Sequence, residues 1–155
     1  MLRVLRERHP EVDIVVLPQG SPARRAPEVD QLGSDALADD LERALDDLVD
    51  RLGSGAPLGS VLRDHRWQTD EWDQTWYEAV AVVDELAEGQ NVALLRATGQ
   101  ALVDLGWQAR PVPGDRPRLV ARRRGGAEAT ATVRPTALVL TVRTAKIRVV
   151  EEAAR

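Results

Sequence analysis

The chain of 155 residues contains no cysteine and no phenylalanine, and it has a single methionine and a single tyrosine. The absence of cysteine excludes disulfide scaffolds, zinc sites with thiolate ligands, iron–sulfur clusters and thiol nucleophiles. Because only four tryptophans and one tyrosine supply aromatic rings, the hydrophobic core must consist mainly of leucine, valine, isoleucine and alanine. Each tryptophan is therefore expected to be a conspicuous part of the packing.

Long apolar runs are also missing from the sequence. No stretch reaches the roughly 18 apolar residues of a membrane span, and residues 1–18 do not resemble a secretory signal peptide. We therefore expect a soluble cytoplasmic protein without a membrane partner. A chain of this length folds as about one domain and buries roughly two-thirds of its surface, so its stability requires neither a disulfide nor a metal.

The motifs of common enzyme classes are absent as well. The sequence has no phosphate-binding Walker loop, no dinucleotide fingerprint, no serine elbow, no HExxH and no EF-hand loop. His65 is close in sequence to Asp70, Glu71 and Asp73, but no second histidine falls within reach by spacing. Asp70 and Glu71 are explained as first-turn residues of a helix. We predict no catalytic residues, no metal site and no cofactor.

The net charge of −4 hides an unequal distribution along the chain. Residues 1–105 contain 21 acidic and 10 basic residues, which gives −11, whereas residues 106–155 contain 4 acidic and 11 basic residues, which gives +7. Such an asymmetry bears on binding partners and association rates, and it says nothing about the fold.

The N-terminal third of the sequence is predicted to lie outside the main domain. Residues 1–17 read as a short helix and a strand that dock on the main domain, and residues 18–34 read as a flexible linker rich in proline and glycine. Residues 35–52 are predicted to form an acidic helix that is capped by Ser34 and has leucines on one side. We expect this helix to be peripheral and to move.

The main domain, residues 58–155, is predicted to begin with a helical hairpin at residues 69–105. Its first helix follows Thr69 and carries Trp72 and Trp76, while its second helix begins with Asn91 as the cap and ends before Gly106. Gly99 is expected to let the two helices approach closely.

After Gly106 the hydrophobic period changes from 3.6 to 2, which predicts strands. Short turns separate five runs of strand length: 107–112, 118–124, 128–134, 137–143 and 146–150. Connections this short favour an antiparallel meander. The predicted fold class is therefore α+β, with two layers: an antiparallel meander of four or five strands packed against a helical hairpin, with the acidic helix at the periphery.

Alternation along these strands assigns the aliphatic residues to the inner face and arginine and threonine to the outer face. The candidate partner-binding arginines are Arg118, Arg122, Arg124, Arg134, Arg143 and Arg148. Their guanidinium groups suit carboxylates or phosphates, although arginine on a strand face also serves simply to prevent pairing with other chains. A further option is that the acidic helix lies near these arginines and competes with an anionic ligand.

We predict a non-enzymatic protein-binding or adaptor module. Its partner is a protein, and an acidic surface on that partner would suit the arginines. The partner is bound through the basic sheet face or through a tryptophan-bearing helix, where Trp67, Trp72 and Tyr77 are candidate contacts. The alternatives are a binder of the nucleic-acid phosphate backbone, disfavoured because the face has no rings for stacking, and a small enzyme of unknown class. A second copy of the chain is also a candidate partner.

Overall fold

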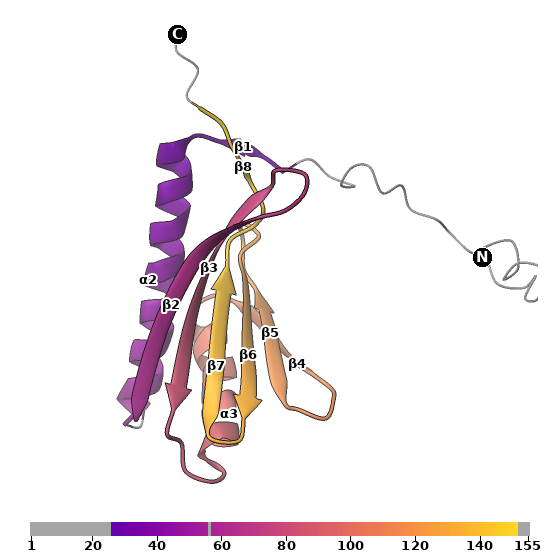
Figure 1. Cartoon of the computed structure of the whole chain (residues 1–155). Coiled ribbons are helices and arrows are strands. Elements are labelled where there is room, and N and C mark those ends of the chain that lie inside the picture. Colours follow the sequence, from indigo (N-terminus) through magenta and orange to yellow (C-terminus); the bar gives the residue numbers. More distant parts are fainter. Residues whose placement is uncertain (1–25, 56, 152–155) are drawn as a thin grey trace, which may run out of the picture.

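The computed structural model describes residues 26–55 and 57–151, which form an α+β fold (Figure 1). The predictions for residues 1–17 and for most of the linker at 18–34 lie outside the described residues. The elements in chain order are β1 (Glu28–Val29), α2 (Gln31–Gly55), β2 (Ser60–Thr69), β3 (Thr75–Asp84), α3 (Gln90–Asp104), β4 (Gln108–Val112), β5 (Arg118–Arg122), β6 (Glu128–Arg134), β7 (Ala137–Arg143) and β8 (Arg148–Val149).

The main sheet has six strands in the order β2-β3-β7-β6-β5-β4, and every neighbouring pair is antiparallel. Strands β4 to β7 form the predicted meander, which confirms the fold class. The sheet is wider than expected because the β2–β3 hairpin joins it beside β7. The last predicted strand, 146–150, is not a member of this sheet: β8 pairs in parallel with β1, and Ile147 makes an isolated bridge to Thr75.

The prediction of a helix after Thr69 is wrong, because β3 occupies residues 75–84. Trp72, Trp76 and Val80 are spaced by four residues, and this spacing fits a strand period of two as well as a helix. The β-branched and aromatic content of the run favours a strand. No secondary structure was predicted for residues 60–68, which form most of β2. Two helices in contact with each other do pack on the sheet, but they are α2 and α3.

The acidic helix is present and longer than predicted. Asp30 caps it, since its carboxylate accepts the Gly33 amide at 2.7 Å, whereas Ser34 is buried in the first turn and donates to the Gln31 carbonyl at 2.9 Å. Ser34 is therefore not the cap. The helix is also not merely peripheral, since its leucine stripe lies in the core: Leu41, Leu45, Leu48 and Leu52.

Helix α3 covers the other part of the sheet. Asn91 is not the cap, which is Gly89; instead the Asn91 amide donates to the Arg134 carbonyl at 2.7 Å and ties the helix to the sheet. A Cβ at Gly99 would lie 3.1 Å from Leu119 Cδ1, so the close approach that this glycine permits is to β5 and not to the other helix. Gly106 ends the helix with φ 94°, as predicted.

Both helices lie on one side of the sheet, and the core fills the space between (Figure 1). The inner-face assignment of the meander is confirmed by buried residues on three strands: Ala121, Ala129, Ala131, Val133, Leu138, Leu140 and Val142. No described helix covers the opposite side, which we call the outer sheet face. Neither described helix is both long and apolar enough to cross a membrane.

Candidate functional site

One row of side chains, all charged except the last, crosses the outer sheet face and is called the charged row. The register places its members side by side in the order Arg66, Glu78, Arg143, Glu128, Arg122 and Gln108. Glu128 accepts a hydrogen bond from Arg143 Nε at 3.0 Å, and its other oxygen lies 3.6 Å from Arg122 Nε. Arg66 pairs more loosely with Glu78 at 3.9 Å. Glu128 therefore neutralises part of the positive charge that the sequence places on this face.

Beside the charged row lies an apolar region that we call the aliphatic strip. The register places Leu62, Val82 and Val139 next to one another on β2, β3 and β7. The adjoining row contributes Val80 and, beyond two threonines, Val120. Leu62 is 59% exposed and the valines are half-buried, although no described helix or strand lies over them. The strip is an uncovered apolar surface that runs from the edge strand β2 to β7 on an otherwise polar face.

Three exposed arginines form the opposite end of this face, which we call the arginine end: Arg110 on β4, Arg118 on β5 and Arg134 on β6. Among the described residues these three side chains form no ion pair. They are therefore available to carboxylates of a partner.

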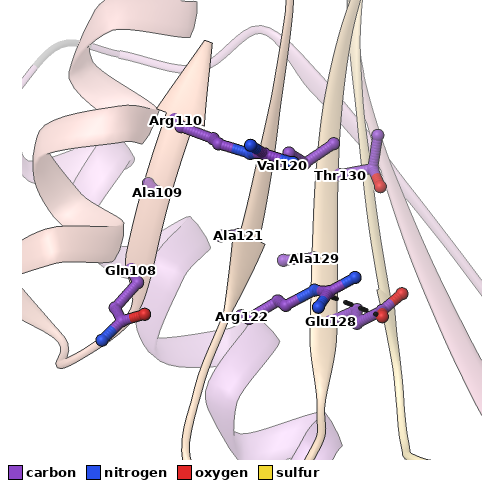
Figure 2. Close-up of a pocket in the computed structure, with 9 residues that line it drawn as sticks. All are labelled: Gln108, Ala109, Arg110, Val120, Ala121, Arg122, Glu128, Ala129 and Thr130. Carbon is purple, nitrogen blue, oxygen red and sulfur yellow. Dashed lines mark ion pairs between the residues drawn. The ribbon is translucent and has the colours of Figure 1, made fainter. Parts of the chain in front are cut away.

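A concavity of about 500 Å³ lies over β4, β5 and β6, between the arginine end and the charged row. Figure 2 shows Arg110 extending from β4 toward Val120 on β5, and Arg122 extending from β5 toward β6, where it meets Glu128. Thr130 lies on β6 beside this concavity. Two guanidinium groups and a hydroxyl can hold a carboxylate or phosphate. The negative charge of Glu128 disfavours the binding of an anion in this concavity.

The structure brings together four of the six predicted arginines. Arg118, Arg122, Arg134 and Arg143 are exposed on the outer sheet face. Arg124 lies in the turn between β5 and β6. Arg148 is half-buried on β8, away from this face.

The predicted tryptophan-bearing helix does not exist, because Trp67 and Tyr77 lie on the paired strands β2 and β3. Their ring centroids are 5.1 Å apart on the helix side of the sheet, and Trp67 is 39% exposed. Trp72 lies in the turn between these strands and is half-buried. The predicted aromatic contacts are therefore split between the hairpin turn and the inner side of β2 and β3.

Tyr77 is buried and ties the sheet to α2. Its hydroxyl donates to Glu42 at 2.8 Å, and Arg63 binds both Glu42 and Asp46 at 2.7 Å. Burial raises the pKa of Tyr77 well above its ordinary value, and the Glu42 carboxylate raises it further. Trp67 is thus the member of the aromatic pair that offers surface to a partner.

The carboxylates near His65 serve the hairpin turn. Asp70 accepts the amides of Trp72 and Gln74 at 3.0 and 2.9 Å, and Lys146 binds its second oxygen at 3.1 Å. Burial raises the pKa of Asp70, but these hydrogen bonds outweigh burial, so the pKa lies below its ordinary value. Within the described residues, no three histidine or carboxylate side chains cluster in a way that could hold a metal ion.

The acidic helix meets the sheet on its inner side. Arg123 pairs with Asp40 at 2.5 Å, and its guanidinium lies 4.9 Å from the ring centroid of the buried Trp107. Because α2 and the outer arginines are on opposite sides of the sheet, this helix does not cover the outer sheet face. The option that it competes there with an anionic ligand is not supported.

Several residues of this face were missed by the sequence analysis. Leu62, Arg66, Glu78 and Val82 lie on the strands that were not predicted. Glu128 could have been found, because the alternation that turns Thr130 outward turns Glu128 outward too.

Comparison of the chain with protein-family models, with curated protein sequences and with solved structures finds no significant match.

Proposed function

We propose that this chain is a non-enzymatic protein-binding module and that its partner is a protein bound on the outer sheet face. The observation that carries the proposal is the aliphatic strip, which joins Leu62, Val82 and Val139 across three strands without cover from a described element. An apolar centre with a polar rim is typical of protein interfaces, and contiguous exposed apolar surface generally has a function.

The charges around the strip favour a protein over a nucleic acid. Arg122 and Arg143 are already bound to Glu128, so a phosphate backbone has to compete with that carboxylate. Glu78 and Asp64 add further negative charge at the β2–β3 end of the face. Trp76 lies under the Lys146 ammonium, 5.0 Å from its ring centroid, which leaves its ring poorly placed for base stacking.

The arginine end gives the partner an orientation. Arg110, Arg118 and Arg134 suit carboxylates of the partner, while the aliphatic strip suits its apolar side chains. The expected partner surface therefore has an apolar centre and acidic residues on one side. A cytoplasmic location, expected from the sequence, remains a prediction.

A phosphate-backbone binder is the second candidate function. The concavity between Arg110 and Arg122 favours it, because two guanidinium groups reach into one site (Figure 2). A small enzyme of unknown class is the third alternative.

The test is affinity capture from the source cell with the wild-type chain and two lysine variants. Val139→Lys places a charge in the aliphatic strip, and Val103→Lys makes the same change on α3, where Val103 is 52% exposed. We expect the wild type and Val103→Lys to capture the same protein with and without nuclease, and Val139→Lys to lose it.

The two leading functions predict opposite effects of Val139→Lys. An added positive charge strengthens binding to a phosphate backbone, and that binding falls steeply with salt. Capture that is lost on nuclease treatment and increased by Val139→Lys would overturn the proposal in favour of nucleic acid. Equal protein capture by all three chains would overturn the choice of this face.

A further inference from the structure

Strand β2 forms a long, open edge of the main sheet. It has ten residues, Ser60–Thr69, and within residues 26–55 and 57–151 its only strand neighbour is β3 (Figure 1). The opposite edge, β4, is half as long and contains Pro111. Long edges without proline invite pairing with another strand, and natural proteins usually blunt them.

The hydrogen bonds of β3 identify the backbone groups that β2 presents to solvent. The Tyr77 amide donates to Thr144 Oγ1, and the Tyr77 carbonyl accepts the Thr144 amide, both at 3.0 Å. Tyr77 therefore uses its backbone groups on the β7 side, so those of its partner Trp67 point away from β3. The His65 amide likewise donates to the Asp64 carboxylate at 2.8 Å instead of to β3. The odd-numbered residues of β2 thus face the open edge.

We propose that a second copy of this chain pairs its β2 antiparallel to this edge, with the two-fold axis at His65, so that the two sheets become continuous. Charge selects this register. A two-fold centred on Asp64 opposes two aspartates, and one centred on Arg66 opposes two arginines. Centring on His65 places Asp64 of each copy directly opposite Arg66 of the other, on the outer side of the sheet.

The same register covers apolar surface on the inner side. Arg63 of one copy lies opposite Trp67 of the other, where its aliphatic stem can cover the exposed part of the ring. The acidic α2 helices of the two copies oppose the association. Arg63 already binds Glu42 and Asp46, which reduces that repulsion.

The test is sedimentation equilibrium of the full chain at concentrations up to about 100 μM, with two charge-reversal variants. We expect the wild type to form a dimer of twice the 17.0 kDa chain mass. Arg66→Asp opposes aspartates and Asp64→Arg opposes arginines, so each variant alone should weaken the dimer at least about tenfold. An equimolar mixture of the two variants should restore it, because each chain then meets the opposite charge.

A matched control is Arg118→Asp, which makes the same charge change on β5 and should leave the dimer intact. A wild type that stays monomeric throughout this range would overturn the proposal. So would a dimer that both reversals leave unchanged, or a mixture of two folded variants that stays monomeric. Slow hydrogen exchange of the odd-numbered β2 amides in a monomer would also overturn it, since another segment such as residues 12–17 would then cover the edge.

Discussion

Glu128 determines how much positive charge the outer sheet face offers to a ligand. Its carboxylate binds Arg143 and lies 3.6 Å from Arg122, so Glu128→Gln should release both guanidinium groups. We expect tighter binding of a labelled single-stranded oligonucleotide at low salt, measured by fluorescence anisotropy, because the row becomes more basic. The free energy of unfolding should change by less than about 1 kcal/mol, since the ion pairs are exposed.

The matched control for this change is Glu151→Gln, which removes the same charge from an exposed residue outside the sheet. Equal oligonucleotide binding by the two variants would contradict the role assigned to Glu128.

Asp70 makes the hairpin turn sensitive to pH. Because its folded-state pKa is lowered, the stability it contributes is fully present above its ordinary value of 3.8 and is lost as pH falls through the folded-state pKa. Asp70→Asn keeps an acceptor oxygen and removes the charge. We expect this variant to be less stable than the wild type in urea unfolding at neutral pH, and the difference to shrink toward zero in strong acid.

Glu71→Gln is the control for this prediction, since Glu71 is exposed in the same turn. If the wild type and Asp70→Asn differ in unfolding free energy as much in acid as at neutral pH, the charge of Asp70 is not the cause.

At the scale of the elements, α2 is part of the core although seven of its residues are acidic. Leu45 is fully buried, so Leu45→Ala should cost about 2–5 kcal/mol of unfolding free energy. Leu37 lies on the same helix and is partly exposed, so Leu37→Ala should cost less than about 1 kcal/mol. Urea unfolding followed by circular dichroism measures both. Similar small losses for the two variants would mean that the helix packs only loosely.

The meander could be predicted from the sequence because local signals agree there. Residues 128–134 alternate between apolar inner residues and polar outer residues, and turns that contain proline or glycine separate the four strands. The buried Ala129, Ala131 and Leu140 follow this alternation. Because the turns are short, consecutive strands of the meander can only pair antiparallel.

The β2–β3 hairpin could not be predicted in the same way. Asp70 accepts amides two and four residues further along the chain, which is the chemistry of a turn as well as of a helix start. Trp72 and Trp76 then follow at a spacing that both periods share. These residues form a strand because β3 pairs with β7. Since β7 is distant in the sequence, the local sequence does not reveal this pairing.

The candidate site could be predicted only in part. Some of it follows from alternation within single strands, and the rest depends on how the strands pair. Strand parity placed Arg118, Arg122, Arg134 and Arg143 on one face, and this was correct. The pairing of Glu128 with its two arginines depends on the register between three strands. The aliphatic strip depends on β2 and β3, so its existence could not be inferred without them.

At the scale of the whole molecule, the acidic helix and the outer arginines lie on opposite sides of the sheet. An acidic partner is therefore attracted to the arginine end and not to α2. With the captured partner in hand, we expect its association rate to fall as salt rises while its dissociation rate changes little, because the aliphatic strip holds the complex. Surface plasmon resonance at two salt concentrations measures both rates. A dissociation rate that rises steeply with salt would contradict this division of roles.

The most direct test of the central claim is the dissociation constant of the captured partner for Val139→Lys relative to the wild type, with Val103→Lys as the control. If the aliphatic strip is the centre of the interface, the constant rises at least about tenfold for Val139→Lys and stays unchanged for Val103→Lys. An unchanged constant for a folded Val139→Lys chain would contradict the claim that this protein binds its partner through the outer sheet face.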